Sequence, residues 1–346
     1  MLASKSKRWL KKALVGSSIL PLASRFFAPT AAILAYHSVV EEPQRTDYIL
    51  GSSRSRAEFE RHMERLARKF SPVTIDDVAE FARSGQKLPP RAVAVTFDDG
   101  FADNYEIALP ILSRYGIPAT FYIMVDAVEN GTLPWYCRIR FAFNTTKRPH
   151  WTDPNTGRTY GLGSAAERQS AMPPVWDRGA ALAGEEQRAL VESIERALEI
   201  DPAHAQADHG MMMDWDQVRG LKKAGHTIGG HTLSHPNVAQ VSAGEADGEI
   251  TGCKQRIAEK IGAPVEHFSY PHPALNPHWS QQTLDVTREA GFKSAVLTTY
   301  GPVRSGDDPL AMKRLYTPGD LLQFTSNLQA LFLKKNALAA GPVQAG

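Results

Sequence analysis

The order of the predicted secondary structure is the feature that most restricts the fold of this 346-residue chain. From Ala31 to about residue 300, short strands rich in β-branched and aromatic residues alternate with amphipathic helices. Such alternation implies a parallel sheet with right-handed crossovers. Six or seven units of this kind favour a closed α/β barrel, in which functional residues lie at the carboxyl ends of the strands.

The predicted elements follow one another regularly on both sides of a single interruption. Strands are expected at 33–36, 72–75, 93–97, 119–125, 227–228, 265–270 and 293–299. Helices are expected at 59–70, 76–83, 103–115 with a kink at Pro110, 185–198, 215–224, 242–261 and 280–290. Residues 130–210 break the alternation with Gly, Pro, Trp and scattered charge, so we expect an insertion over one mouth of a barrel at 31–335. No chemistry is assigned to it, and residues 336–346 are expected to be a flexible tail.

Two adjacent carboxylates, Asp98 and Asp99, follow the predicted strand at 93–97 and precede Gly100. Burying one ionised carboxylate costs several kcal/mol, and two adjacent ones also repel each other. Such a pair therefore needs water, an arginine or a metal at the end of the strand. A solvated turn is the alternative interpretation, because Asp-Gly is a common turn pair.

A second polar stretch, from Gly229 to Pro236, carries His231 and His235 four residues apart. This spacing can direct both imidazoles at one point, although it is weak support alone in a chain with 11 histidines. Two histidines and one carboxylate form a three-ligand set that leaves the fourth position of zinc open for water. The second carboxylate is then free to act as a base.

Three motifs of the sequence resemble those of a known family. Thr96-Phe-Asp-Asp-Gly100 and His231-Thr-Leu-Ser-His-Pro236 are similar to the first two motifs of the polysaccharide deacetylases with a NodB homology domain, carbohydrate esterase family 4. A third motif is present in altered form as Phe268-Ser-Tyr-Pro-His-Pro273. The resemblance extends from about residue 31 to about residue 320. It implies a distorted (β/α)7-type barrel.

The resemblance also implies an activity and a set of site residues. The activity is metal-dependent removal of N-acetyl groups from amino sugars of a polysaccharide or lipid-linked glycan, with zinc as the default divalent metal. Asp98 corresponds to the general base, and Asp99, His231 and His235 correspond to the metal ligands. The third motif implies an oxyanion donor at the backbone N–H of His272 and substrate contacts at Tyr270 and Pro271.

The chain departs from the family pattern in three places, one of which is the absence of the usual later Asp-Trp motif. The arginine that usually orients the base is missing from the third motif, and Arg314 is the candidate to replace it. The usual late histidine is also missing. Members that act on bacterial exopolysaccharides carry an early Tyr-His instead, so His37 becomes the candidate general acid. A structural histidine at that place is the alternative, and His272 is the next candidate for the acid.

Two other functions remain open at this stage. One is hydrolysis of another small amide, such as a formamido sugar. The other is a non-catalytic glycan-binding barrel, although the intact Asp98 and the three intact ligand positions argue against it.

The charge of the chain is distributed unevenly. Residues 1–30 hold six Lys and Arg and no acid, so the rest carries a net charge of −4 despite an overall +2. An acidic body argues against nucleic-acid binding. For residues 1–25 we favour an amphipathic helix in peripheral contact with a membrane, and a weak signal peptide and a solvated tail are the alternatives. Cys137 and Cys253 are expected to be free thiols. We expect a cytoplasmic or inner-membrane-associated protein, with export as an alternative.

Overall fold

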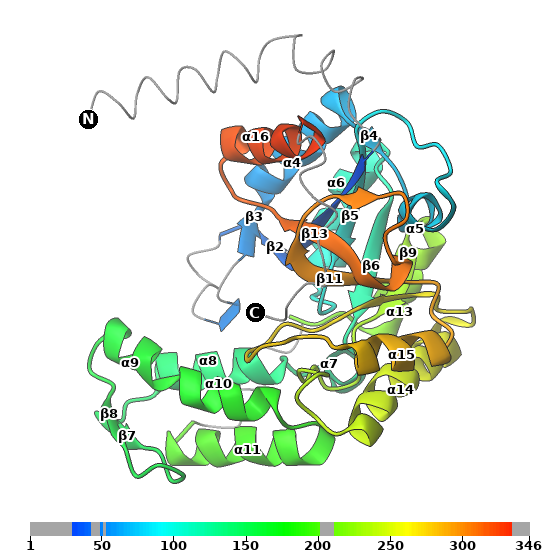
Figure 1. Ribbon diagram of the computed structural model, residues 1–346. Coiled ribbons are helices and arrows are strands. Elements are labelled where there is room, and N and C mark those ends of the chain that lie inside the picture. The colour runs from blue at the N-terminus through cyan, green and yellow to red at the C-terminus, as the bar shows by residue number, and fades with distance from the viewer. Residues whose placement is uncertain (1–29, 43–48, 51–52, 201–210, 334–346) are drawn as a thin grey trace.

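A closed parallel barrel forms the centre of the molecule (Figure 1). The computed structural model describes residues 30–42, 49–50, 53–200 and 211–333. Within these residues, seven parallel strands form a ring in the order β1, β5, β6, β9, β10, β11 and β13, and β13 pairs with β1 to close it. They are β1 Thr30–Tyr36, β5 Ala92–Phe97, β6 Ala119–Ile123, β9 Thr227–Gly230, β10 His267–Ser269, β11 Ser294–Tyr300 and β13 Met312–Tyr316. The predicted (β/α)7-type barrel is confirmed.

The barrel strands are apolar on both faces because side chains fill the interior and helices cover the exterior. All six residues of β5 are buried, which explains its continuous run of apolar residues. β1 and β5 pair in register from Ala32 opposite Val93 to Tyr36 opposite Phe97, so both strands end at the same level. At the edges, β12 (Val303–Arg304) runs antiparallel to β1, and β4 (Ser71–Pro72) runs parallel to β5.

Helices surround the barrel wall in the expected order. They are α4 Arg56–Lys69, α5 Ile75–Ser84, α6 Leu109–Tyr115, α7 Val125–Asn130, α13 Trp215–Lys223, α14 Ala243–Ile261, α15 Gln281–Glu289, the 3-10 turn η3 Pro309–Ala311 and α16 Leu321–Leu333. The predicted apolar face of α4 is buried at Phe59, Met63 and Leu66. The capping box predicted at Ser242 and Glu245 opens α14 as expected.

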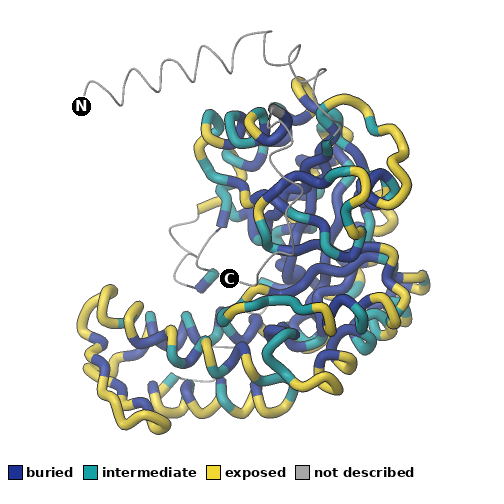
Figure 2. The backbone as a smooth tube through the Cα atoms, in the orientation of Figure 1, coloured by how far each residue is buried: buried dark blue, intermediate teal, exposed yellow. Residues whose placement is uncertain are grey.

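The interruption after β6 is a small helical subdomain. It contains α8 Trp135–Thr145, the hairpin β7 His150–Thr152 and β8 Thr159–Gly161, α9 Ala165–Ala171, α10 Pro173–Ala180 and α11 Gly184–Ala197. It has an apolar cluster of its own, which includes Ile139, Phe143 and Val191. Figure 1 shows these helices beside the barrel, and Figure 2 shows exposed residues along their outer edge. The helix predicted at 185–198 is present as α11, and the boundaries of the insertion at 130–210 stay a prediction.

Several boundaries differ from the sequence prediction for local reasons. Instead of one kinked helix at 103–115, a π-helical segment η2, Asn104–Ala108, precedes α6. Pro110 lies in the first turn of α6, where its missing N–H breaks the regular ladder. The predicted strand at 72–75 shortens to β4, because Thr74 caps α5. The sequence analysis did not predict the closing strand β13 or α16.

The predicted terminal segments at 1–30 and 336–346 lie outside the described residues, apart from Thr30 in β1. Among the helices of the described residues, none combines the length and apolarity that crossing a bilayer requires.

Candidate active site

The end of β5 brings two neighbouring carboxylates to the mouth of the barrel. The N–H of Asp98 donates to the carbonyl of Tyr36 at 3.0 Å and extends the β1–β5 ladder by one residue. The chain then turns at Asp99 and Gly100, whose φ angles are 77° and 89°. A Cβ on Gly100 would lie 3.1 Å from a methyl carbon of Val128, so glycine relieves both the backbone strain and the crowding. This turn lets Asp98 and Asp99 contact different partners.

Asp98 forms a buried bidentate ion pair with Arg314 of β13. The Nη1–Oδ1 and Nη2–Oδ2 distances are 2.8 and 2.7 Å. Arg314 also donates to the carbonyl of Leu297 and to the hydroxyls of Thr96 and Ser269, so all five of its N–H groups have an acceptor. Burial alone would raise the pKa of Asp98, but the charge and hydrogen bonds of Arg314, together with the nearby histidines, outweigh burial and hold that pKa below its usual value. Asp98 is therefore ionised at neutral pH.

The position of Arg314 answers a question that the sequence left open. The third motif lacks the arginine that orients the base in similar proteins. The structure brings Arg314 to Asp98 from another strand, 216 residues later in the chain. Ser269, in the altered third motif, accepts a hydrogen bond from Arg314 at 3.0 Å. Arg314 thus occupies the place for which the sequence named it as a candidate.

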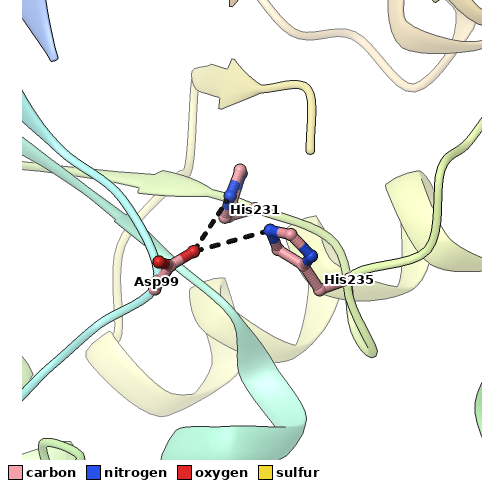
Figure 3. Close-up of side chains that lie close together, drawn as sticks. All are labelled: Asp99, His231 and His235. Atoms are coloured by element: carbon pink, nitrogen blue, oxygen red, sulfur yellow. Dashed lines mark ion pairs between the residues drawn. The ribbon is translucent and has the colours of Figure 1, made fainter. Parts of the chain in front are cut away.

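Asp99 faces two histidines that follow β9 (Figure 3). Its Oδ1 lies 3.3 Å from Nε2 of His231 and 3.5 Å from Nε2 of His235. Nδ1 of His231 lies 2.7 Å from the carbonyl oxygen of Ser269, which places the proton on Nδ1 and leaves the lone pair of Nε2 facing Asp99. The structure therefore brings the three predicted ligand residues together.

These three residues fit a divalent cation. Their donor atoms lie within 4.8 Å of one another, and Oδ1 of Asp99 is buried without a hydrogen-bond partner among the described residues. Burial lowers the pKa of His235 to about 3, so this imidazole is neutral and able to coordinate at pH 7. One carboxylate and two imidazoles are a donor set that zinc accepts with a fourth position open.

The loop that carries the histidines is fixed by hydrogen bonds that the sequence analysis did not foresee. Thr232 and His235 have φ angles of 64° and 65°, and the hydroxyl of Thr232 accepts the N–H of His235 at 3.0 Å. Glu249, which is buried on α14, accepts the N–H groups of Leu233 and Ser234 at 2.8 Å each. A glutamate inside a predicted helix gave no sign of this role, because the contact depends on how α14 packs.

A cavity of about 340 Å³ lies in front of these groups, which is the size of a small-ligand site. The barrel contributes Asp98, Asp99 and both histidines of the ligand set to its wall. His37, the residue after β1, also lines the cavity. The positions predicted for the base, the ligands and the acid thus share one cavity, and their chemical roles remain predictions.

The insertion supplies another part of the cavity wall, with Tyr136 and Arg140 of α8 and Trp176 of α10. The ring of Tyr136 lies 5.0 Å from that of His235, and the indole N–H of Trp135 donates to the carbonyl of His235 at 3.0 Å. The sequence analysis assigned no chemistry to this segment. One sequence pattern could have indicated this role. Tyr136 and Arg140 are four residues apart, which puts both on one helix face.

The third motif is placed differently from the prediction. Tyr270 is buried, packs edge-on against Phe268 and donates to the hydroxyl of Thr287 at 2.8 Å. Its predicted contact with substrate is therefore wrong, because its side chain points into the core. Pro271 is also buried, and the cavity wall is formed by His272 and Pro273 instead. His272 lies at the exposed rim, next to the ring of His278.

Comparison with known proteins indicates the same family that the sequence motifs resemble. The polysaccharide deacetylase family model matches residues 85–295. A putative polysaccharide deacetylase of Bacillus subtilis, YxkH, is 33% identical over 99 residues, which cover 28% of this chain and 32% of that protein. The poly-beta-1,6-N-acetyl-D-glucosamine N-deacetylase of Escherichia coli K12 is 33% identical over 88 residues, which cover 25% of this chain and 13% of that protein. The aligned segments thus span about a third of the first relative's length and much less of the second's.

A solved structure shares the fold. The Streptococcus pyogenes deacetylase PplD, in complex with acetate, superposes with a TM-score of 0.57 at 17% sequence identity. The match covers 88% of this chain and 99% of that one. Because the family model covers more than half of the sequence and the barrel has the same architecture, this chain belongs to the polysaccharide deacetylase family.

Proposed function

We propose that the protein is a metal-dependent hydrolase that removes N-acetyl groups from the amino sugars of a polysaccharide or a lipid-linked glycan. One observation carries the proposal. An ionised carboxylate, Asp98, is oriented by Arg314 in the same cavity as a donor set that fits a divalent cation. A glycan-binding barrel has no need of an oriented base beside such a set.

The carboxylates and histidines at the mouth of the barrel have separate parts in this reaction. A divalent cation held by Asp99, His231 and His235, with zinc as our proposed metal, would polarise the acetamide carbonyl and acidify the attacking water. Asp98 accepts the proton of that water, and Arg314 keeps Asp98 charged and correctly oriented.

The oxyanion of the tetrahedral intermediate needs donors that are already in place. The backbone N–H of His272 is one proposed donor, as the family resemblance implies. The hydroxyl of Tyr136 is a second, because it is buried in the cavity wall without a partner among the described residues. A hydroxyl in this state is free to donate to a substrate.

The departing amine needs a proton from a group with a pKa near neutral, and histidine meets this requirement. His37 lines the cavity and is half-buried at the end of β1, on the same side of the barrel as Asp98. We therefore assign the general acid to His37.

Similarity to a named enzyme supports the choice of sugar. The E. coli relative is named for poly-beta-1,6-N-acetyl-D-glucosamine, and its similarity includes part of the family region. We propose an N-acetylglucosamine-containing glycan as the substrate on that basis, either as a finished polymer or as a lipid-linked precursor.

Acetate release from N-acetylated glucosamine oligosaccharides tests the proposal, with Asp98→Asn as the inactive variant. Asp216→Asn is the matched control, because Asp216 is an exposed carboxylate on α13. We expect acetate from the wild type and the control, and none from Asp98→Asn. Formate from formamido sugars without acetate would instead indicate a deformylase. Absence of any product, with the glycan still bound, would indicate a binding protein.

We also propose that residues 1–25 bind anionic membranes and hold the protein at the inner membrane. The six basic residues in 1–30 and their helical spacing against Trp9 and Leu10 support this. Sedimentation with anionic liposomes, comparing the full chain with one that starts at residue 30, tests it. Equal recovery of both in the pellet would refute membrane binding.

A further inference from the structure

Two arginines face the cavity without an acidic partner among the described residues. Arg54 belongs to β3 (Ser53–Ser55), which pairs with β2 (Ser38–Val40) on the barrel side, and Arg140 belongs to α8 on the insertion side. Neither forms an ion pair with a carboxylate of the described residues. Their positions place one positive charge on each side of the cavity.

The arginines before and after Arg140 in the insertion, Arg138 and Arg148, are each paired with a glutamate. Arg138 binds Glu195 through two hydrogen bonds of 2.9 and 2.6 Å, and Arg148 binds Glu199 at 2.7 Å. Arg140 instead lies over the ring of Trp176, at 5.1 Å from its centroid, and its Nε is buried without an acceptor in the described part of the chain. A guanidinium N–H that is removed from water without a partner is unfavourable, so an acceptor from a ligand would stabilise it.

Arg54 is held in a fixed orientation. Its Nε donates to the carbonyl of Thr317 at 2.9 Å, and its Nη1 donates to the carbonyl of Ser53 at 3.0 Å. Carbonyl oxygens orient the guanidinium but do not neutralise it. The remaining Nη2 donates to no acceptor among the described residues, and the group lines the cavity.

The acids in the cavity wall do not compensate for these charges. Asp98 and Asp99 are the carboxylates that line it within the described residues. Asp98 is fully engaged by Arg314, and Asp99 faces the two histidines. A cation at the latter site would make the cavity more positive still. Guanidinium groups bind carboxylates, phosphates and sulfates through paired hydrogen bonds, so such a cavity favours an anionic ligand.

We propose that the substrate is an acidic glycan, in which an anionic group lies close to the N-acetyl group that is removed. Arg140 and Arg54 attract that anion from the two sides of the cavity, and the inference rests on the proposed deacetylase function. Arg140 lies four residues after Tyr136, which is about 6 Å along the helix axis. Because Tyr136 lies beside the metal-site residue His235, this offset places the anion on a sugar next to the reacting one. The anion is either the carboxylate of a uronic acid or a phosphate or sulfate ester.

Calorimetric titration of the full chain tests this inference, in an Asp98→Asn background that prevents turnover. Three probes share an N-acetylglucosamine backbone. The first is an oligosaccharide that alternates N-acetylglucosamine with glucuronic acid, the second is its carboxyl-reduced form, and the third is a sulfated chito-oligosaccharide. We expect at least one acidic probe to bind about 10-fold or more tightly than the reduced one. The acidic probe that binds identifies the source of the anion.

Adding Arg140→Gln or Arg54→Gln should remove this preference without changing the affinity for the reduced probe. Arg148→Gln is the matched control, because it removes a charge from the same subdomain away from the cavity wall. Arg140→Lys should restore part of the preference, since it keeps the charge but not the paired donors. Equal affinity for the acidic and reduced probes, or a preference that both glutamine variants retain, would overturn the proposal.

Wild-type acetate release from the same probes separates this inference from the proposed function. An arginine-dependent preference without any acetate would leave the anion site standing and refute the deacetylase. Acetate release from the neutral probe alone would support the deacetylase and refute the anion site.

Discussion

The two walls of the cavity differ in whether their polar groups have hydrogen-bond partners. On the barrel side, all five N–H groups of Arg314 have acceptors, and both oxygens of Asp98 are engaged. On the insertion side, the hydroxyl of Tyr136, Nε of Arg140 and Nε1 of Trp176 are all buried without a partner in the described residues. The barrel wall is thus organised for chemistry before a ligand arrives, and the insertion wall lacks partners that a ligand can supply.

Oδ1 of Asp99 is an informative exception on the barrel side. It is buried and unpaired, as the insertion groups are, but it faces two imidazole nitrogens rather than open cavity. A cation suits the position between Asp99 and the two imidazole nitrogens. A sugar with hydroxyl and anionic groups suits the unpaired groups of the insertion wall. The unpaired groups of the two walls would thus accept different kinds of ligand.

The largest expected effect concerns the metal ligands on the barrel wall. Asp99→Ala, His231→Ala and His235→Ala should each abolish metal binding and turnover, because each removes one of three donors. Elemental analysis of purified protein measures the bound metal. Full occupancy in any one variant would remove that residue from the ligand set.

The second prediction concerns His37, which also belongs to the barrel wall. His37→Ala should lower turnover by about 10²–10⁴-fold, the usual contribution of a general acid, while metal content and fold stay unchanged. Steady-state rates across pH should also show a flatter alkaline limb. A wild-type rate and an unchanged profile would exclude His37, and His272 would become the next residue to test.

The third prediction compares one arginine from each wall. Arg314→Met should lower the free energy of unfolding by about 3–5 kcal/mol, because it leaves the buried charge of Asp98 unpaired. Arg140→Met should change it by less than about 1 kcal/mol, because no carboxylate of the described residues loses a partner. Urea denaturation measures both. Equal losses of unfolding free energy in the two variants would contradict the proposed difference between the two walls.

The smallest expected effect is that of one hydroxyl on the insertion wall. Tyr136→Phe should lower turnover by about 10²-fold if the hydroxyl donates to the oxyanion. Its free energy of unfolding should change by less than about 1 kcal/mol, because the hydroxyl is near Asp99 but makes no hydrogen bond of normal geometry within the described residues. Tyr160→Phe, on β8 of the same subdomain, is the control for both measurements. A loss of stability without a loss of turnover would make Tyr136 a structural residue.

The sequence predicted the parts of the site that follow directly from local order. Asp98, Asp99 and His231 come at the ends of recognisable strands, and strand ends of a parallel barrel converge at one mouth. Arg314 was a candidate without a location, because β13 is short and its pairing with β1 and β11 depends on the whole ring closing. Tyr270 was misplaced because a strand end does not fix the direction in which a side chain points.

The insertion shows the limit of reasoning from spacing. Tyr136 and Arg140 share a helix face, but which face of α8 meets the barrel depends on the apolar cluster of the insertion. Periodicity in α8 marks a buried side without saying whether a core or a ligand covers it. The contacts of Trp135 with the His235 loop settle that orientation.

The closure of the barrel by β13 has a consequence for the newly made chain. Arg314 leaves the ribosome 216 residues after Asp98, which at about 5–20 residues per second is a delay of about 10–40 s. During this interval the nascent chain already has Asp99 and, later, both histidines, but the base has no counter-charge and β1 and β11 lack the strand that joins them. A ribosome that stalled before β13 would therefore hold a chain that has Asp99, His231 and His235 but lacks the counter-charge of Asp98, so the Asp98–Arg314 ion pair is among the last contacts that synthesis allows.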